Sequence, residues 1–207
     1  MSAPVVGVLA IQGDFEAHAR ALAEVGAEPR VVRTPEDLVG LDGLVIPGGE
    51  STTMTLGIER ERLAEPLREL VRSGRPVLGT CAGLIMLDRE HLGLLDATAR
   101  RNAFGRQLQS FEADLDLRLE NAAGLGGAAG NGYSARPSAG PSGPLRAVFI
   151  RAPWVEEHGP EVEVLAEVGG HPVAVRQGNI LAVAFHPELT DDRSLHRWLV
   201  AHASVRS

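Results

Sequence analysis

The segment Pro76-Val-Leu-Gly-Thr-Cys81-Ala-Gly-Leu-Ile85 decides the fold, because it joins a short apolar run directly to a helix-like run that continues to Glu90. The apolar run from Pro76 to Gly79 predicts a buried strand. Between strand and helix, Cys81 occupies the centre of the pattern glycine, any residue, nucleophile, any residue, glycine, which is typical of a nucleophile elbow. So sharp a turn crowds the backbone and tolerates only small flanking residues. We therefore expect Cys81 to project above an α/β sheet.

The same alternation of strands and helices extends upstream of this segment. Apolar runs predict strands at residues 5–11, 30–33 and 41–46, and helical spacing predicts helices at residues 16–25 and in a stretch that ends at Gly74. Strands joined through helices form right-handed units with a parallel sheet covered on both faces. We therefore expect a three-layer, open, mostly parallel α/β sheet.

The second half of the chain has a different pattern. Residues 107–119 alternate polar and apolar side chains, and residues 161–185 carry three short β-like runs separated by turn signals, which predicts antiparallel strands added to the parallel core. Residues 190–203 predict a closing helix. Residues 121–144 are rich in glycine, proline and serine, and we expect a flexible insertion there; a domain linker is the weaker alternative, because few residues follow it. Residues 1–207 are thus expected to form a single domain.

Composition excludes several functions. The single cysteine rules out an intrachain disulfide and a cysteine-based metal cage, and we expect no metal and no cofactor. All 20 basic residues are arginines, so this chain supplies no lysine for a phosphate-binding loop or a Schiff base. The net charge of −7 argues against nucleic acid as a ligand. No apolar run approaches the roughly 20 residues that span a bilayer, and no secretory signal is visible. We expect a cytoplasmic protein without membrane contact.

A thiol nucleophile needs a base and a group that orients the base. The tripeptide His186-Pro187-Glu188 offers both, because residues two apart in an extended segment point to the same side. Each motif has a simpler interpretation: a lone cysteine is most often a small buried hydrophobe, and His186 could merely follow a strand. Taken together, the cysteine elbow and the histidine–carboxylate pair favour catalysis.

A glycine pair follows the third predicted strand, in Pro47-Gly48-Gly49-Glu50-Ser51-Thr52-Thr53. Paired glycines let backbone N–H groups approach a ligand closely, which suits a carboxylate or a developing oxyanion. A tight turn with a helix cap is the alternative interpretation.

Together these motifs resemble the triad-type class I glutamine amidotransferases, whose fold is flavodoxin-like. More narrowly, the chain is similar to the family of glutaminase subunits of pyridoxal 5′-phosphate synthase. This narrower resemblance rests on five further stretches in the same order: residues 7–13 (GVLAIQG), 101–107 (RNAFGRQ), 110–114 (SFEAD), 149–153 (FIRAP) and 185–190 (FHPELT).

The resemblance implies hydrolysis of L-glutamine to glutamate and ammonia through a cysteine thioester. The ammonia would pass to a synthase subunit, which supplies the lysines and forms a large heteromeric complex with this chain. Cys81 would be the nucleophile, His186 the general base and acid, and Glu188 its orienting partner. The resemblance also assigns glutamine binding to Gly49, Glu50, Ser51, Arg101, Ile150 and Arg151, an oxyanion hole to the N–H groups of Gly49 and Ala82, and a partner-facing position to Gln12.

Two other hypotheses stay open at this point. A cysteine peptidase-like or chaperone-like protein of related fold would share the elbow, and a non-catalytic regulatory subunit would keep the fold without the reaction. The remaining histidines have no setting comparable to that of His186 and are expected to be surface or core residues: His18, His91, His158, His171, His196 and His202.

Overall fold

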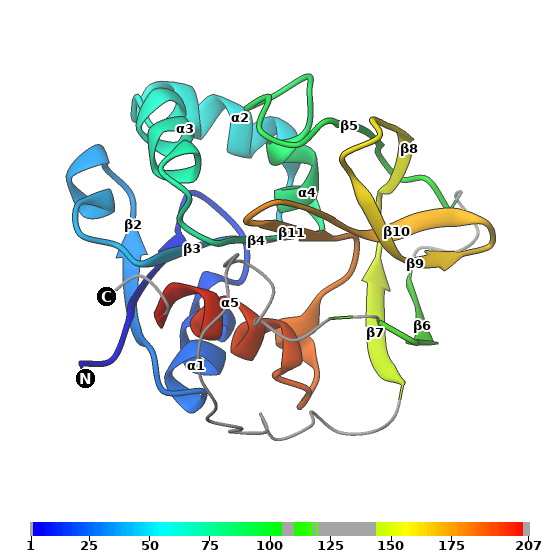
Figure 1. Cartoon of the computed structure of the whole chain (residues 1–207). Helices are drawn as coiled ribbons and strands as arrows, with labels where there is room; N and C mark the ends of the chain where they lie inside the picture. The colour runs from blue at the N-terminus through cyan, green and yellow to red at the C-terminus, as the bar shows by residue number, and fades with distance from the viewer. Residues whose placement is uncertain (1, 105–109, 118, 120–143, 205–207) are drawn as a thin grey trace, which may run out of the picture.

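The computed structural model describes residues 2–104, 110–117, 119 and 144–204. A seven-stranded sheet lies at its centre, in the order β2-β1-β3-β4-β11-β10-β9 (Figure 1). The strands are β1 (Val5–Leu9), β2 (Glu28–Val32), β3 (Gly43–Ile46), β4 (Val77–Thr80), β9 (Glu163–Val168), β10 (His171–Gln177) and β11 (Ile180–Val183). The first five in the sheet order are parallel, and β10 and β9 extend it antiparallel. The expected mostly parallel α/β sheet is confirmed.

Helices cover both faces of this sheet. On one face lie α2 (Ser51–Arg60), α3 (Ala64–Arg72) and α4 (Ala82–Leu87), and on the other lie α1 (Phe15–Glu24) and α5 (Ser194–Ser204) (Figure 1). Strand β3 is continuously apolar because both of its faces are buried. Leu44 and Ile46 pack in the core with α2 to α4, and Val45 packs in the core with α1 and α5. A strand buried on both faces has no position for a polar side chain.

The helix ends follow local sequence signals. Asp14 caps α1, because its Oδ1 accepts a hydrogen bond from the N–H of Ala17 at 3.1 Å. Pro66 lies in the first turn of α3, where a missing N–H costs nothing, so it does not kink the helix. The chain also forms short 3₁₀ helices, η1 (Pro35–Leu38) after β2 and η2 (Pro187–Leu189) after β11.

Two small antiparallel sheets lie outside the main one. Strand β5 (Ala97–Arg100) pairs with β8 (Trp154–His158), and β6 (Ser110–Leu115) pairs with β7 (Leu145–Ile150). The predicted antiparallel strand in residues 107–119 is confirmed as β6, but it lies in a separate small sheet and does not join the central one. Within this small sheet, Phe111 of β6 stacks on Phe149 of β7, with ring centroids 4.5 Å apart.

The expectation of antiparallel strands in residues 161–185 is confirmed for β9 and β10, and β11 also pairs antiparallel with β10. Strand β11 forms a hairpin with β10 but pairs parallel with β4, so it extends the parallel core. Its central place explains why every residue from Ile180 to Val183 is buried. The predicted insertion at residues 121–144 lies outside the described residues, except for Pro144.

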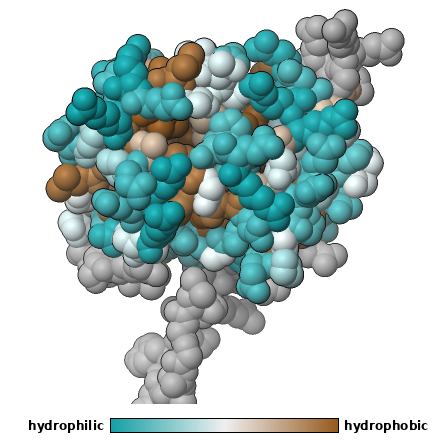
Figure 2. Space-filling view, turned by 90° about the horizontal axis from the view of Figure 1, so that it is seen from above, coloured by the Kyte–Doolittle hydropathy of each residue, from teal (hydrophilic) through white to brown (hydrophobic). Residues whose placement is uncertain are grey.

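The surface is mostly polar in the view of Figure 2, where hydrophilic side chains surround smaller hydrophobic areas. Large hydrophobic side chains that are exposed in the described part of the chain are Val31, Val39, Leu56, Ile150 and Leu189. Among the described residues, no helix is both long and apolar enough to cross a membrane.

Candidate active site

Cys81 lies in the turn between β4 and α4, as the elbow motif predicts. Its backbone has φ 49° and ψ −107°, a conformation that L-residues adopt only at a cost of about 1–3 kcal/mol. The N–H of Cys81 donates to the carbonyl of Val183 on β11 at 2.8 Å, which fixes the turn against the neighbouring strand. The strained turn directs the thiol away from the strand. Cys81 as a whole is only 7% exposed.

The two glycines of the motif are required by close packing. A Cβ on Gly83 would lie 1.9 Å from the carbonyl oxygen of Ile46, at the end of β3. A Cβ on Gly79 would lie 3.0 Å from the backbone of Gly83. Helix α4 therefore begins in direct backbone contact with β3 and β4, and only glycine allows that approach.

His186 follows β11, and β11 is the neighbour of β4, so the histidine and the cysteine lie beyond the carboxyl ends of adjacent strands. The Nδ1–H of His186 donates to Oε1 of Glu188 at 2.7 Å, which leaves Nε2 for the thiol. Burial by itself would lower the pKa of His186, but hydrogen bonds to Cys81 and Glu188 and the charges of both groups outweigh burial and raise the pKa to about 10. A Cβ on Gly48 would lie 2.6 Å from Cε1 of this ring, so the glycine loop packs directly on it.

Glu188 is buried behind His186. Burial raises the pKa of this carboxyl, but hydrogen bonding and electrostatic attraction from His18 and His186 outweigh burial and hold the pKa well below its usual range. The contact with His18 was not predicted. The sequence interpretation treats His18 as an ordinary surface or core residue; it is fully buried, but Nε2 lies 3.2 Å from Oε2 of Glu188. Its only sequence signal is a histidine on the apolar face of α1.

Replacing Glu188 with glutamine tests this ionisation. A carboxyl whose pKa is lowered in the folded state contributes stability above its ordinary pKa of 4.5 and loses that contribution as the pH falls further. We expect Glu188→Gln to be less stable than the wild type by about 2 kcal/mol at pH 7. Urea unfolding should show this gap shrinking steadily below about pH 4.5. A gap that is the same at pH 7 and pH 3.5 would mean that Glu188 is not held as an anion.

A cleft of about 430 Å³ opens beside Cys81. Its lining brings together every candidate site residue except Glu188: Gln12, Gly49, Glu50, Ser51, Cys81, Ala82, Arg101, Ile150, Arg151 and His186. Thr52, Ile85, Asn102 and Pro153 complete it, although no site role is assigned to them from the sequence. Side chains from six separate segments thus converge on one thiol, at a volume ordinary for a small-molecule site.

The glycine loop is held from both sides. The N–H of Glu50 donates to Oε1 of Gln12 at 3.0 Å. The carboxylate of Glu50 caps α2 by accepting from the N–H groups of Thr52 and Thr53, and these backbone hydrogen bonds lower its pKa to about 2. The side chain of Glu50 is thus committed to the helix end. Any contact of Glu50 with a ligand is left to its backbone.

Two residues that line the cleft have a backbone N–H group without a partner among the described residues. Of the residues that the structure describes, neither Gly49 nor Ala82 donates a hydrogen bond from its N–H. Both are among the residues assigned to the oxyanion hole. Unused N–H groups beside a nucleophile can receive the negative charge that develops on a carbonyl oxygen under attack.

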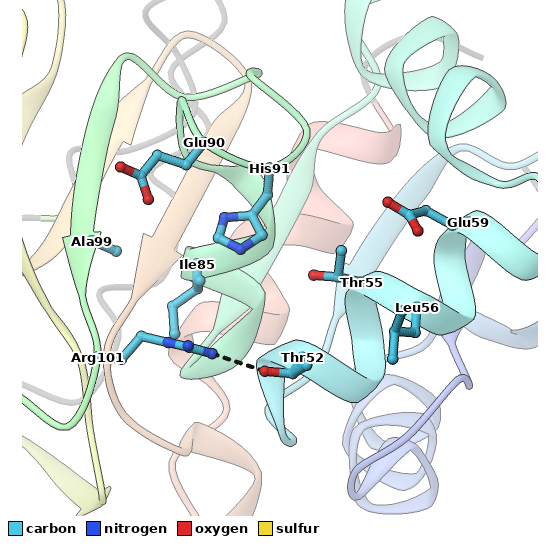
Figure 3. Close-up of a pocket in the computed structure, with 9 residues that line it drawn as sticks. All are labelled: Thr52, Thr55, Leu56, Glu59, Ile85, Glu90, His91, Ala99 and Arg101. Carbon is cyan, nitrogen blue, oxygen red and sulfur yellow. Dashed lines mark hydrogen bonds between the residues drawn. The ribbon is translucent and has the colours of Figure 1, made fainter.

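Arg101 joins the cleft to a second hollow. Its Nη1 donates to Oγ of Ser51 at 2.6 Å and to Oγ1 of Thr52 at 3.1 Å. A hollow of about 480 Å³ lies on the other side of this contact. Figure 3 shows the residues that line it, between α2 and the segment that follows α4. Thr52, Ile85 and Arg101 line both spaces. The guanidinium thus forms part of the wall between them.

Comparison with known proteins decides the family. The model of the SNO glutamine amidotransferase family matches residues 8–205. The chain belongs to this family. SNO-family membership makes the chain a glutamine amidotransferase, and it confirms the resemblance on which the sequence analysis relied.

Two full-length relatives carry the same name. The "Pyridoxal 5′-phosphate synthase subunit PdxT" of Mycolicibacterium vanbaalenii is 50% identical over 99% of this chain and 100% of the relative. The protein of that name from Streptomyces avermitilis is 52% identical over 95% of this chain and 92% of the relative.

Solved structures agree with the SNO-family fold. A crystal structure described as a glutamine amidotransferase is 43% identical, covers 96% of this chain and 98% of its own, and superposes with a TM-score of 0.80. PurLQS from Thermotoga maritima, 19% identical over 98% of each chain with a TM-score of 0.68, shares the fold alone. The arrangement of sheet and helices described above is thus that of class I glutamine amidotransferases.

Proposed function

We propose that this chain is the glutaminase subunit of a pyridoxal 5′-phosphate synthase. It hydrolyses L-glutamine to L-glutamate and ammonia and delivers the ammonia to a synthase subunit for vitamin B6 synthesis. The observation that carries the proposal is that one cleft is lined by Cys81, His186, Gly49 and Ala82, the last two with N–H groups unpaired among the described residues. The names of the full-length relatives support the pathway. We propose that residues 1–207 act as one domain, in the cytoplasm.

The geometry supports a thioester mechanism. His186 takes the thiol proton, the sulfur of Cys81 attacks the side-chain amide carbon of glutamine, and the N–H groups of Gly49 and Ala82 stabilise the oxyanion that forms. His186 protonates the amide nitrogen, the carbon–nitrogen bond breaks, and ammonia leaves with a glutamyl thioester behind it. His186 then takes a proton from water, the hydroxide attacks the thioester, and glutamate and the thiol are released. Glu188 holds the imidazole in the required tautomer through its 2.7 Å contact with Nδ1.

Arg101 is proposed to bind glutamine, and its neighbour offers a matched control. Arg101 lines the cleft, whereas Arg100 pairs with Glu156 on the surface. We expect Arg101→Met to raise KM for glutamine about tenfold or more, because a charge-assisted contact is lost, and to lower kcat less. Arg100→Met should leave both constants within about twofold. Steady-state glutamate formation at varied glutamine measures the two constants. Equal effects of the two variants would remove Arg101 from the binding site.

A partner is expected to complete the oxyanion hole. Gln12, which holds the glycine loop through Glu50, is proposed to face the synthase subunit. We propose that docking there sets the N–H groups of the loop for catalysis, since ammonia released without an acceptor is wasted.

The deciding experiment measures glutamate formed from glutamine by the purified chain alone and with a pyridoxal 5′-phosphate synthase subunit added. Low activity alone that rises with the partner would support both the reaction and the complex. No glutamate in either condition, from folded protein in a demonstrated complex, would overturn the proposal. Cleavage of a peptide substrate unaffected by a glutamine-analogue electrophile would favour the peptidase-like alternative.

A further inference from the structure

Three buried side chains from three separate elements meet behind Glu188. They are His18 of α1, Thr80 at the end of β4 and His196 of α5, and each is 0% exposed. Nε2 of His18 lies 3.2 Å from Oε2 of Glu188 and 3.2 Å from Oγ1 of Thr80. Nδ1 of His18 lies 3.0 Å from Nε2 of His196. The two histidines therefore continue the row of polar groups that begins at Cys81 and His186.

The contacts assign the protons of this row. A ring nitrogen with a lone pair would repel a carboxylate oxygen 3.2 Å away, so Nε2 of His18 carries a proton. Nδ1 of His196 is buried and has no hydrogen-bond partner among the described residues. A proton placed there would be a buried donor without an acceptor, so His196 carries its proton on Nε2 and donates it to Nδ1 of His18. Each ring is then neutral, with one proton.

The same contacts show what the carboxylate lacks. Oε1 of Glu188 accepts from His186. Oε2 is buried and accepts no well-aligned hydrogen bond within the described part of the chain. The Nε2–H of His18, shared with Thr80, is the positive end of a dipole at that oxygen. A buried carboxylate with one satisfied oxygen depends on such a neighbour to stay ionised and in one orientation.

We propose that His18 is a positioning residue for glutamine hydrolysis: its Nε2–H holds Glu188 in the orientation that directs His186 at Cys81, and His196 fixes the tautomer of His18. This inference rests on the proposed function. It adds a residue on the first helix to a triad formed by residues at the ends of β4 and β11.

The charged and titratable groups around Glu188 determine how a change at His18 alters the pH dependence of the rate. His186 faces it from its own segment, His18 from α1 and, one ring further, His196 from α5. Cys81 lies beyond His186, and the charge of Arg193 acts on His196. Burial, together with the electrostatic effects of His18 and Arg193, lowers the pKa of His196 to about 3, so His196 stays neutral at working pH. A change in the acidic limb of the rate profile then reports on the triad.

The test compares His18→Leu, His18→Gln and His18→Asn with the wild type, each in complex with the synthase subunit. The amide nitrogen of glutamine can take the place of Nε2, whereas that of asparagine reaches only the place of Nδ1. We expect His18→Leu and His18→Asn to lower kcat/KM for glutamine about tenfold and to move its acidic limb up by about one pH unit, because Glu188 loses a stabilising donor. His18→Gln should restore both the rate and the limb. Thermal unfolding of each variant accompanies the kinetics.

The outcomes separate the two proposals. A wild-type complex that forms no glutamate would overturn the proposed function, and the inference that rests on it would fall too. If the wild type is active and His18→Leu and His18→Asn keep both its rate and the acidic limb of its pH–rate profile, the inference alone is overturned. So would a loss of rate with an unmoved limb in all three variants, which is the mark of a merely structural histidine. If His18→Leu fails to fold, the glutamine and asparagine variants decide between these results.

Discussion

Cys81→Ala is expected to abolish glutamate formation by the complex, with a loss of at least about 10⁴-fold in kcat. Alanine removes only the sulfur, and no other cysteine exists in the chain to replace it. His186, Glu188 and the oxyanion donors would have no atom to activate. The loss should appear in kcat, since the rest of the glutamine cleft stays intact.

The fold should survive this change. The residue keeps its small size, and the backbone hydrogen bond from Cys81 to Val183 does not involve the side chain. Circular dichroism and co-purification with the synthase subunit are the controls. A variant that keeps more than a tenth of wild-type turnover would show that Cys81 is not the nucleophile.

Gly83→Ala is expected to destabilise the protein by about 3 kcal/mol or more, because a new Cβ would lie 1.9 Å from the carbonyl oxygen of Ile46. This neighbour is backbone, and its strand is paired with β4, so it cannot turn aside as a side chain would. Helix α4 would have to move away from the sheet and take the turn at Cys81 with it. Urea unfolding at neutral pH measures the loss.

Gly26→Ala provides the matched control. A Cβ on Gly26 meets nothing within 4 Å, but its φ of 88° strains any L-residue. We expect a loss of about 1 kcal/mol from conformation alone. If Gly83→Ala costs no more than Gly26→Ala, the tight approach of α4 to β3 does not limit the fold.

Much of the fold could be predicted because its decisive signals are local. The apolar runs that end in glycine or small residues before Cys81 mark a strand on a doubly covered sheet, and β1 to β4 were all expected. Strand pairing at long range has no comparable signal. Nothing in residues 180–183 distinguishes a strand that pairs parallel with β4 from another antiparallel addition. The pairs β5 with β8 and β6 with β7 were missed for the same reason.

The site shows the same division. Cys81, His186 and Glu188 could be chosen from sequence because their motifs are compact, and the resemblance supplied Arg101 and the pair Ile150-Arg151. The roles of individual residues within the cleft were harder to predict from sequence. The carboxylate of Glu50 looks available for substrate in the sequence, but in the structure it caps α2. His18 could not be found, since its contact with Glu188 exists only after α1 packs beside the segment that follows β11.

The adjacency of β4 and β11 has a consequence for protein synthesis. The nucleophile leaves the ribosome about a hundred residues before the histidine that activates it, which at about 5–20 residues per second is a delay of several seconds or more. During that interval β1 to β4 are available to assemble, but the last parallel strand of the sheet is missing. The nascent chain therefore carries an unactivated thiol until β11 and His186 have also been translated.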